Sequence, residues 1–463
     1  MKKIVPHLFI VLLLIALLPS FIFAQSLQDG AAVKKILQQR IDIDKKGVGI
    51  AVGIINEKGI KLINYGKMNV KESREVAADS FFEIGSITKV FTGILLADMV
   101  TRGEMKLDDP ISLYLPKSVK VPTRNGKEIT LVDLATHTSG LPRMPTNFKP
   151  KDLSNPFADY TEQQLYEFLS NYTLPRDIGS LYEYSNVGMG LLGHILALKA
   201  KTDYESLVLY RICKPLKMND TRITLSAEQK SRLATGHNTN FQPVPNWDIA
   251  SLAGAGALRS TVNDMLKFLA ANMGLVKTDL LPVLQKSHQI PKPAEGKQTD
   301  VALGWHINKR YGTEIIWHNG GTGGYRTFIG FAPAKRAAVV VLSNANSGQD
   351  DIGLHILESQ YALQNFAPPK QRTEIKVTAE ILETYVGEYQ LAPNFKLTVT
   401  KEDDKLFVQA TDQPKFQVFA ESAGEFFYKA VDAQITFVKD DKGQITQLIL
   451  HQGGQNIPGK KIK

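Results

Sequence analysis

The stretch FFEIGSITKVFTGILL, residues 81–96, is almost entirely apolar, yet it carries a serine and a lysine three positions apart, Ser86 and Lys89. Positions i and i+3 lie on one face of a helix, so a helix that begins near Ser86 places the Lys89 amine beside the Ser86 hydroxyl. The apolar pattern continues to Val100 and predicts a buried helix that is ended by Gly103. The stretch therefore predicts a core helix that begins at a serine with a base beside it.

The Ser86 and Lys89 pair has the composition of a nucleophile and its base. A serine hydroxyl is a poor nucleophile near pH 7 unless a neighbouring group takes its proton. Lys89 can do so only if burial or a nearby positive charge lowers its pKa far below about 10.4. The alternative is that Ser86 caps the helix while Lys89 extends to solvent, and the spacing by itself favours this alternative.

Strand patterns lie on both sides of this helix in the chain. Residues 47–67 contain two β-branched runs joined by a turn that ends at Gly59, which predicts a hairpin. Three more strands are expected in EIIWH, YRTFIGFAP and AAVVVLSN, which begin at residues 314, 325 and 337, with turns at Gly320 to Gly324 and at Pro333 to Arg336. Helical patterns fill the chain between them: TEQQLYEFLSNY, NVGMGLLGHILALKAK and STVNDMLKFLAANM, the last capped by Ser260 or Thr261. We therefore expect an α+β fold, an antiparallel sheet flanked by helices with a separate all-helical layer.

The two ends of the chain differ from this body. Residues 1–24 have a positive start, a short apolar core and a small final residue, which predicts a secretory signal peptide. A membrane anchor is the alternative, but the apolar run Leu8 to Leu18 is well short of the roughly 20 residues that span a bilayer. We expect a body at 25–366, a proline-containing linker at 367–374 and a small β-rich domain, barrel or meander, at 375–463.

Composition excludes several classes of function. The net charge of +9 is mild and dispersed, so nucleic acid is not an expected partner. The single cysteine, Cys213, permits no internal disulfide and lies in an apolar segment, where it is expected to fill the core. The chain has no G-x-S-x-G, no H-E-x-x-H and no Cys/His cluster, so we expect neither an α/β-hydrolase elbow nor a metal, and no cofactor. His137-Thr138-Ser139-Gly140 is interpreted as a structural turn.

Two further motifs have residue types suited to acyl transfer. In LYEYSNVGMG, residues 181–190, Tyr184 can share a proton with a buried lysine and pass it to a leaving group, while the Asn186 amide can orient both partners. Taken by itself, a tyrosine at the position of Tyr184 is more often an aromatic residue at the start of a helix than a catalytic base. In IIWHNGGTGGYRTF, residues 315–328, His318 leaves a strand into glycines that let the backbone approach a substrate closely. The amide of Gly321 could face that of Ser86 as an oxyanion hole worth about 3 kcal/mol or more.

Ser86-x-x-Lys89, Tyr184-x-Asn186 and His318-x-Gly320 occur in the order and rough spacing of the serine β-lactamase and penicillin-binding-protein superfamily, and FEIGSITK resembles its class C stretch. The resemblance covers about residues 30 to 365 and includes LATHTSGLP, AGALRST, LGWH and HNGGTGGYRTFIGF. It implies an antiparallel sheet with the site between sheet and helices. The C-terminal domain resembles the small lipocalin-like domain often appended to this branch.

The resemblance also implies roles for individual residues. Ser86 would attack a carbonyl and become acylated, Lys89 and Tyr184 would move the proton, and Asn186 would place the substrate amide. The backbone amides of Ser86 and Gly321 would bind the oxyanion, and water would release the acid.

Two positions depart from the pattern. Thr88 stands where class C more usually has Ser or Ala, which is minor. His318 replaces the lysine that opens the third motif of true β-lactamases, which removes a fixed positive charge and weakens capture of a substrate carboxylate. His at this position resembles the D-aminopeptidase, carboxypeptidase-like and esterase branches. Arg326 can restore the charge, although a surface role on its strand is the more common one.

The sequence therefore predicts an exported, periplasmic or extracellular serine hydrolase that forms an acyl-enzyme on Ser86. Its expected substrates contain amide bonds of the β-lactam or D-amino-acid-peptide type. A carboxylesterase and a penicillin-binding sensor module that acylates without turnover are the alternatives. We expect no membrane span after signal cleavage, and cell-envelope material is a candidate partner of the C-terminal domain.

Overall fold

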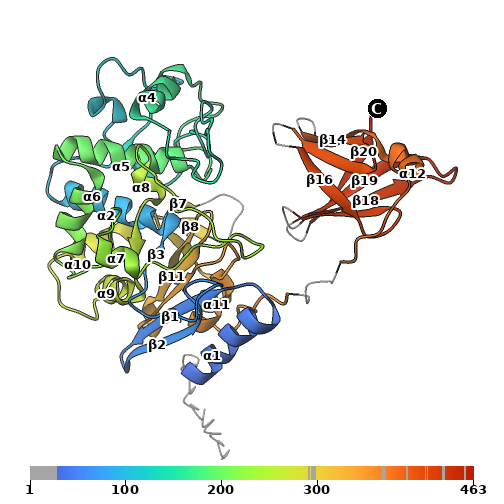
Figure 1. Cartoon of the computed structure of the whole chain (residues 1–463). Coiled ribbons are helices and arrows are strands. Elements are labelled where there is room, and N and C mark those ends of the chain that lie inside the picture. The colour runs from blue at the N-terminus through green and yellow to red at the C-terminus, as the bar shows by residue number, and fades with distance from the viewer. Residues whose placement is uncertain are drawn as a thin grey trace, which may run out of the picture.

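The computed structural model describes residues 29–289, 292–293, 299–366, 372–392, 395–411, 413, 415–429, 433–452 and 455–463. The predicted signal peptide at 1–24 and residues 367–371 of the predicted linker lie outside the described residues. Figure 1 shows a body of sheet and helices, coloured from blue to orange, and a barrel coloured orange to red.

An antiparallel sheet of eight strands forms the centre of the body, in the order β2-β1-β12-β11-β10-β9-β8-β7. β1 pairs with β12 over a long sequence separation, from Ile50 opposite Ser343 to Ile55 opposite Ala338. The predicted sheet that draws strands from both ends of the body is thereby confirmed. The strands are β1 (Gly49–Asn56), β2 (Gly59–Gly66), β7 (Lys292–Pro293), β8 (Thr299–Val301), β9 (His306–Asn308), β10 (Ile315–Gly321), β11 (Arg326–Ala332) and β12 (Ala337–Ser343).

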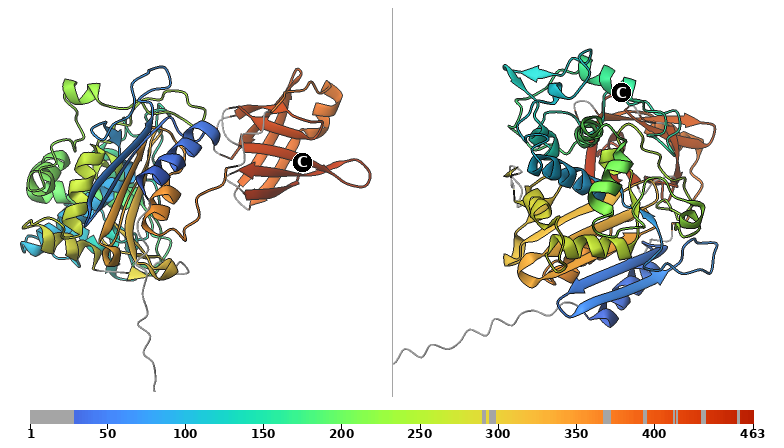
Figure 2. Two further views of the ribbon diagram at one scale, coloured as in Figure 1. Left: turned by 90° about the horizontal axis from the view of Figure 1, so that it is seen from below. Right: turned by 90° about the vertical axis from the view of Figure 1, so that its left-hand side faces the viewer.

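Both faces of the sheet are covered by helices, so its central strands are buried on both sides. Ile50, Val52 and Ile54 of β1 join a core cluster with α1 (Gly30–Gln38) and α11 (Asp350–Leu357). The other face meets α9 (Val262–Asn272), where a Cβ added to Gly53 would lie 2.6 Å from Val262 Cγ1. Figure 2 shows α1 and α11 on one side of the sheet and the remaining helices on the other.

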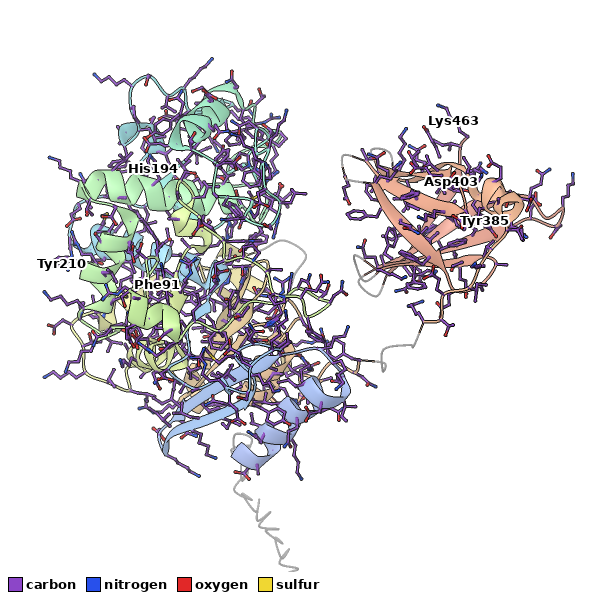
Figure 3. The ribbon with its side chains drawn as sticks, in the orientation of Figure 1. Phe91, His194, Tyr210, Tyr385, Asp403 and Lys463 are labelled. Carbon is purple, nitrogen blue, oxygen red and sulfur yellow. The ribbon has the colours of Figure 1, made fainter. Side chains whose placement is uncertain are left out.

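The helical layer is built around α2 (Thr88–Thr101), in which every residue from Thr88 to Met99 is buried. A helix that is apolar on all sides must have protein on all sides, and α2 contacts α5, α8 and α10. The other helices of this layer are α3 (Leu131–Ala135), α4 (Glu162–Asn171), α5 (Asn186–Ala200), α6 (Tyr204–Val208), α7 (Ala227–Ser231), α8 (Ala253–Gly256) and α10 (Leu281–His288). In Figure 3, Phe91 of α2 lies inside the body, whereas Tyr210 lies at its edge.

The helices predicted from TEQQLYEFLSNY, NVGMGLLGHILALKAK and STVNDMLKFLAANM are confirmed as α4, α5 and α9. The cap of α9 is Thr261, whose hydroxyl accepts a hydrogen bond from the amide of Asp264. Shorter elements are the strands β3 (Phe82–Glu83), β4 (Thr123–Arg124), β5 (Lys127–Glu128) and β6 (Arg259–Ser260), the 3-10 turns Gly85–Ile87, Ile111–Leu113, Arg310–Gly312 and Pro333–Lys335, and the π-turns Gln39–Ile43 and Leu209–Cys213.

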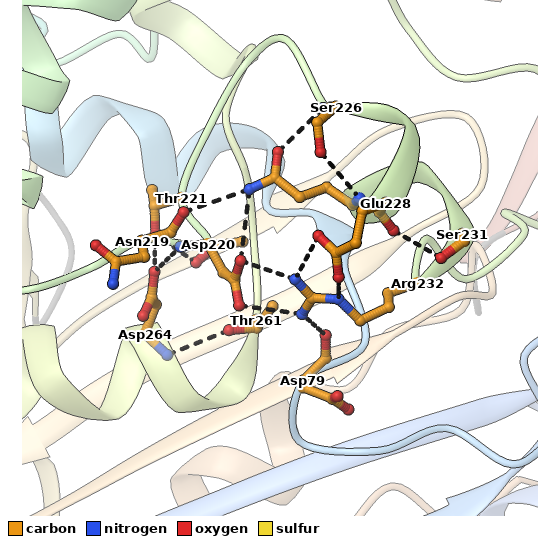
Figure 4. A network of polar contacts seen from close by, with 12 residues as sticks. Asp79, Asn219, Asp220, Thr221, Ser226, Glu228, Ser231, Arg232, Thr261 and Asp264 are labelled. Carbon is orange, nitrogen blue, oxygen red and sulfur yellow. Dashed lines mark hydrogen bonds and ion pairs between the residues drawn. The ribbon is translucent and has the colours of Figure 1, made fainter.

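A polar network supports the strand that leads to the Ser86 turn. The Arg232 guanidinium donates to both carboxylate oxygens of Asp220 and to the carbonyl of Asp79, while the Asp220 amide donates to the carboxylate of Asp264 (Figure 4). The carbonyl of Arg232 in turn accepts from the amide of Phe81, 2.8 Å away. The network thus joins α7 and α9 to the start of β3.

Residues after 372 form a closed barrel of eight strands joined in sequence order, with α12 (Ala379–Tyr385) before it. The barrel closes where Tyr389 of the first strand pairs with Lys461 of the last. Its core is aromatic, with Tyr385 stacked on Phe437 at 4.3 Å between centroids. The predicted β-rich fold is confirmed as a barrel. The strands are β13 (Gly387–Ala392), β14 (Phe395–Glu402), β15 (Lys405–Ala410), β16 (Lys415–Ala420), β17 (Glu425–Tyr428), β18 (Ala433–Lys439), β19 (Ile445–Gln452) and β20 (Gln455–Lys461).

Candidate active site

Ser86 lies in a single 3-10 turn, Gly85–Ile87, and α2 begins two residues after it at Thr88. The α-helix predicted to start near Ser86 therefore starts slightly later, after a 3-10 turn whose first residue, Gly85, has φ of +51°, a backbone conformation that favours glycine. Side chains at i and i+3 eclipse in a 3-10 turn. Lys89 Nζ consequently lies 2.9 Å from Ser86 Oγ.

Lys89 is fully buried, with 0% exposure. Burial lowers the pKa of Lys89 well below its usual value, and the positive charge of Arg143 lowers it further. Its Nζ also donates to the carbonyl of Ala255 at 2.6 Å, which orients the amine. The alternative in which Lys89 extends to solvent is wrong, and the amine has the properties of a neutral base beside a serine hydroxyl.

Tyr184 and Asn186 lie at the start of α5. The centroid of the Tyr184 ring is 4.9 Å from Lys89 Nζ. Burial raises the pKa of Tyr184, while its hydrogen bond with Ser86 acts in the opposite direction, so the phenol keeps its proton at neutral pH. The Asn186 amide nitrogen lies 3.5 Å from Met144 Sδ, and among the described residues the Lys89 amine donates to Ser86 and Ala255 but makes no hydrogen bond with Asn186. The predicted orienting contact of Asn186 is therefore not made in this structure, and the weak sulfur contact leaves its amide accessible to a ligand.

His318 is on β10 and is 1% exposed. Its Nδ1 lies 2.5 Å from the carbonyl oxygen of Asn319, which can only accept, so Nδ1 carries the proton. Burial lowers the pKa of His318 well below its usual value, with His306 and Lys89 acting in the same direction. Its buried Nε2 makes no hydrogen bond to any residue that the structure describes. His318 thus presents a neutral acceptor rather than a cation.

The end of β10 packs tightly against the Ser86 turn. A Cβ added to Gly320 would lie 2.0 Å from the carbonyl oxygen of Ile84, and one added to Gly85 would lie 2.7 Å from the amide nitrogen of Gly321. β10 extends through Gly321, because Gly320 and Gly321 pair with Thr327 and Arg326 of β11. The predicted turn at Gly320 to Gly324 is therefore wrong at its start and begins at Thr322. The amide of Gly321 lies beside the Ser86 turn, as an oxyanion hole requires.

Arg326 pairs with Gly321 across the β10–β11 ladder and is half-buried rather than a simple surface residue. A Cβ added to Gly321 would lie 1.7 Å from Arg326 Nη1, so the guanidinium lies over this glycine. Burial lowers the pKa of Arg326, and the charge of Asp350 opposes that effect. Burial also raises the pKa of Asp350 to about 6, although its carboxylate accepts from Asn319 Nδ2 at 2.5 Å.

The sequence interpretation missed His137, Tyr182, His306 and Arg143. His137 is in the predicted turn and has φ of +60°, but its ring also lies 4.6 Å from that of Tyr184, and its Nδ1 accepts from the amide of Ser185. Tyr182 bonds to His306 Nε2 at 3.1 Å. The local signal was the concentration of His, Tyr and Arg in LATHTSGLPR and LYEYSN, which no short-range pattern relates to Ser86.

Within the described ranges, no group of three or more His, Cys, Asp or Glu side chains has the arrangement of a metal site. No helix in that same part of the chain is long and apolar enough to cross a membrane. Cys213 is buried, and burial raises the pKa of its thiol.

Comparison with known proteins agrees with this geometry. A family model described as Beta-lactamase matches residues 32–363, and one described as Domain of unknown function (DUF3471) matches residues 371–461. The chain is 31% identical over 308 residues to the D-alanyl-D-alanine-carboxypeptidase/endopeptidase AmpH of Escherichia coli (strain K12), covering 64% of this chain and 78% of that one. It is 26% identical over 384 residues to a Beta-lactamase of Psychrobacter immobilis, covering 74% and 92%.

Solved structures show the same fold. The D-alanine carboxypeptidase AmpC from Burkholderia cenocepacia superposes with a TM-score of 0.60 at 25% identity, covering 72% of this chain and 100% of that one. The resemblance inferred from the three motifs is confirmed over the body of the molecule. The chain therefore belongs to the beta-lactamase family of serine hydrolases.

Proposed function

We propose that this chain is an exported hydrolase that forms an acyl-enzyme on Ser86 and cleaves amide bonds of the β-lactam or D-amino-acid-peptide type. The observation that carries the proposal is the 2.9 Å separation of Lys89 Nζ and Ser86 Oγ, with the amine fully buried and its pKa lowered. A lysine in this state takes a proton from a hydroxyl near neutral pH, which a solvated lysine cannot do.

In acylation, Ser86 Oγ attacks the substrate carbonyl carbon while Lys89 takes the serine proton. The carbonyl oxygen becomes an oxyanion, which the backbone amides of Ser86 and Gly321 stabilise. The C–N bond then breaks, and the leaving amine receives a proton from the Tyr184 phenol, which Lys89 reprotonates. The raised pKa of Tyr184 suits this donor role, since the phenol is protonated at neutral pH.

In deacylation, water attacks the ester carbonyl of the acyl-enzyme and gives its proton to the neutral Lys89 amine. The ester C–O bond breaks, the proton returns to Ser86 Oγ, and the carboxylic acid leaves. Asn186 has its amide available to hold the substrate amide, and the absence of a side chain at Gly320 lets β10 lie against the backbone of Ile84, two residues before Ser86.

Substrate class and location rest on further observations. The relatives named above include proteins described as D-alanyl-D-alanine and D-alanine carboxypeptidases, which supports a peptide substrate. Export rests on the signal-peptide pattern of residues 1–24, which supports a location in the periplasm or outside the cell. We assign hydrolysis to the body at 25–366 and a role toward cell-envelope material to the domain at 375–463.

A carboxylesterase is the second candidate, because neutral His318 lacks the cation that captures a substrate carboxylate. The test is intact-mass spectrometry after brief exposure to a β-lactam and, separately, to a short acyl ester, with Ser86→Ala as control. We expect an adduct on the wild type that is missing from the mutant. Turnover of the ester alone would favour the esterase, and an adduct without turnover would favour a sensor module. No adduct and no turnover with either reagent would contradict an acyl-enzyme on Ser86.

A further inference from the structure

The neutral state of His318 leaves the positive charge of the site to other residues. Two arginines flank the Ser86 turn, Arg326 on β11 of the sheet and Arg143 on the segment before α4 in the helical layer. The charge of Arg326 interacts with the nearby carboxyl group of Asp350. Arg143 forms no ion pair with any carboxylate in the part of the chain that the structure describes, although its charge acts on Lys89, Tyr184 and Arg326.

The backbone holds Arg143 beside the catalytic residues. Its carbonyl oxygen accepts from the amides of Asn186 at 2.9 Å and Val187 at 3.3 Å, and the carbonyl of Pro142 accepts from Ser185 Oγ at 2.6 Å. These bonds attach residues 142 and 143 to the start of α5, which begins at Asn186, two residues after Tyr184. Arg143 is therefore held in place by the same helix start that positions the proton donor.

The side chain of Arg143 lies over the ring of Tyr184, with Cζ 5.1 Å from the ring centroid. The Lys89 amine is 4.9 Å from the same centroid. Arg143 is exposed, so its N–H groups are open to a ligand that enters from solvent. A guanidinium stacked on a ring still presents its N–H edge in the plane of the fork, which is the edge that binds a carboxylate.

Among the described residues, the titratable groups whose pKa the charge of Arg143 shifts carry no negative charge. Burial raises the pKa of Tyr182 to about 12 and raises that of Tyr184 further, so both phenols are neutral near pH 7. Burial lowers the pKa values of His137 and Lys89, and Arg143 contributes to both shifts. An exposed cation beside these neutral groups favours the binding of an anion.

We propose that Arg143 determines substrate specificity by binding a carboxylate of the substrate, and so supplies the cation that His318 does not. This inference rests on the proposed acyl-enzyme function and narrows its substrates to acidic ones. The carboxylate comes either from the leaving group, as in a peptide with a free C-terminus, or from the acyl part. In both cases the anion forms charge-assisted, two-point hydrogen bonds with the guanidinium.

The experiment uses the full-length mature protein and two matched pairs of substrates. The first pair is an acyl-D-Ala-D-Ala peptide and its C-terminal amide, which differ in a carboxylate on the leaving side. The second pair is the 4-nitrophenyl monoester of glutaric acid and 4-nitrophenyl butyrate, which differ in a carboxylate on the acyl side. kcat and KM are measured for the wild type and for Arg143→Gln, Arg143→Lys and Lys149→Gln. Lys149 is an exposed cation on the same segment and controls for loss of charge alone.

At a pH on the plateau above the acidic limb, we expect Arg143→Gln to lower kcat/KM by roughly 10- to 100-fold for the acidic member of one pair and by less than about 2-fold for its neutral partner. The pair that responds identifies the side that carries the carboxylate. Arg143→Lys should recover part of the loss, mainly through KM, and Lys149→Gln should match the wild type. Equal losses on acidic and neutral substrates, or no loss on either acid, would overturn the proposal.

The Ser86→Ala variant separates this proposal from the function on which it rests. If turnover depends on Ser86 but the Arg143 variants lose as much kcat/KM on the neutral substrates as on the acidic ones, the role of Arg143 is overturned. The acyl-enzyme on Ser86 then still stands. Turnover that survives Ser86→Ala, or no turnover of any of the four compounds by the wild type, would overturn the acyl-enzyme and this inference with it.

Discussion

Replacing Gly320 by alanine tests whether the close approach of β10 to the Ser86 turn forms the oxyanion hole. The added Cβ would lie 2.0 Å from the carbonyl oxygen of Ile84 and 2.4 Å from Thr327 Oγ1, whereas ordinary contact begins at 3.4 Å. The nearer obstacle is backbone, which has no rotamer to change, so β10 and the turn must separate by about 1.4 Å (3.4 − 2.0).

A displacement of that size removes the Gly321 amide from hydrogen-bond distance of the oxyanion, since such bonds weaken beyond about 3.2 Å. Loss of one oxyanion donor costs about 10²- to 10³-fold in kcat, or about 3 to 4 kcal/mol of transition-state stabilisation. KM for a small ester should change little, because ground-state contacts of the acyl group do not depend on this amide.

The assay is steady-state hydrolysis of 4-nitrophenyl butyrate together with thermal unfolding of the same samples. Gly348→Ala is the matched control, because a Cβ at this exposed glycine meets nothing within 4 Å. We expect the control to retain wild-type kcat. A Gly320→Ala protein that unfolds cooperatively near the wild-type Tm and keeps kcat within about 3-fold of the wild type would refute the reasoning.

Four further predictions concern the base, its effect on stability, its charge environment and the barrel. Lys89→Met should lower the rate of acylation by an ester by about 10²- to 10⁴-fold, measured by rapid-quench mass spectrometry. It should not lower Tm, because methionine fits a buried apolar site. Acylation at the wild-type rate would contradict Lys89 as the base. Since the folded pKa of Lys89 is lowered, the unfolded chain binds a proton that the native chain does not, so stability should rise with pH up to about 10.4, and Lys89→Met should flatten that slope in urea titrations. The acidic limb of kcat/KM should move to higher pH in Arg143→Gln, because the lost cation no longer lowers the pKa of Lys89; an unchanged limb would contradict this coupling. Phe437→Ala should destabilise the barrel by about 3 to 5 kcal/mol, because it removes a buried ring that stacks on Tyr385, while ester hydrolysis persists. Calorimetry and activity are followed on the same sample. Loss of ester hydrolysis together with unfolding of the barrel would show that the barrel supports the site.

The parts of the fold that follow from local patterns were predictable. The hairpin turn before Gly59, the apolar helix after Ser86 and the alternation along the barrel strands each depend on neighbours a few residues apart, where side-chain periodicity reports burial directly. The contact between Ser86 and Lys89 also follows from their spacing in the sequence. The prediction holds although the helix starts with a 3-10 turn, because both the α-helix and the 3-10 turn bring residues i and i+3 together. The family resemblance rests on three such short motifs.

The state of the site depends on contacts between segments far apart in the chain. The burial that lowers the pKa of Lys89 comes from α5, α8 and α10 packing around α2, and the placement of the Gly321 amide comes from β10 lying against Ile84. Arg143 and His137 reach Tyr184 only because their loop is bonded to the start of α5. The sequence by itself determined which residues can do chemistry and which segments are helix or strand. Only the tertiary structure decided their protonation and their neighbours, because dielectric environment and distance are properties of the packed chain.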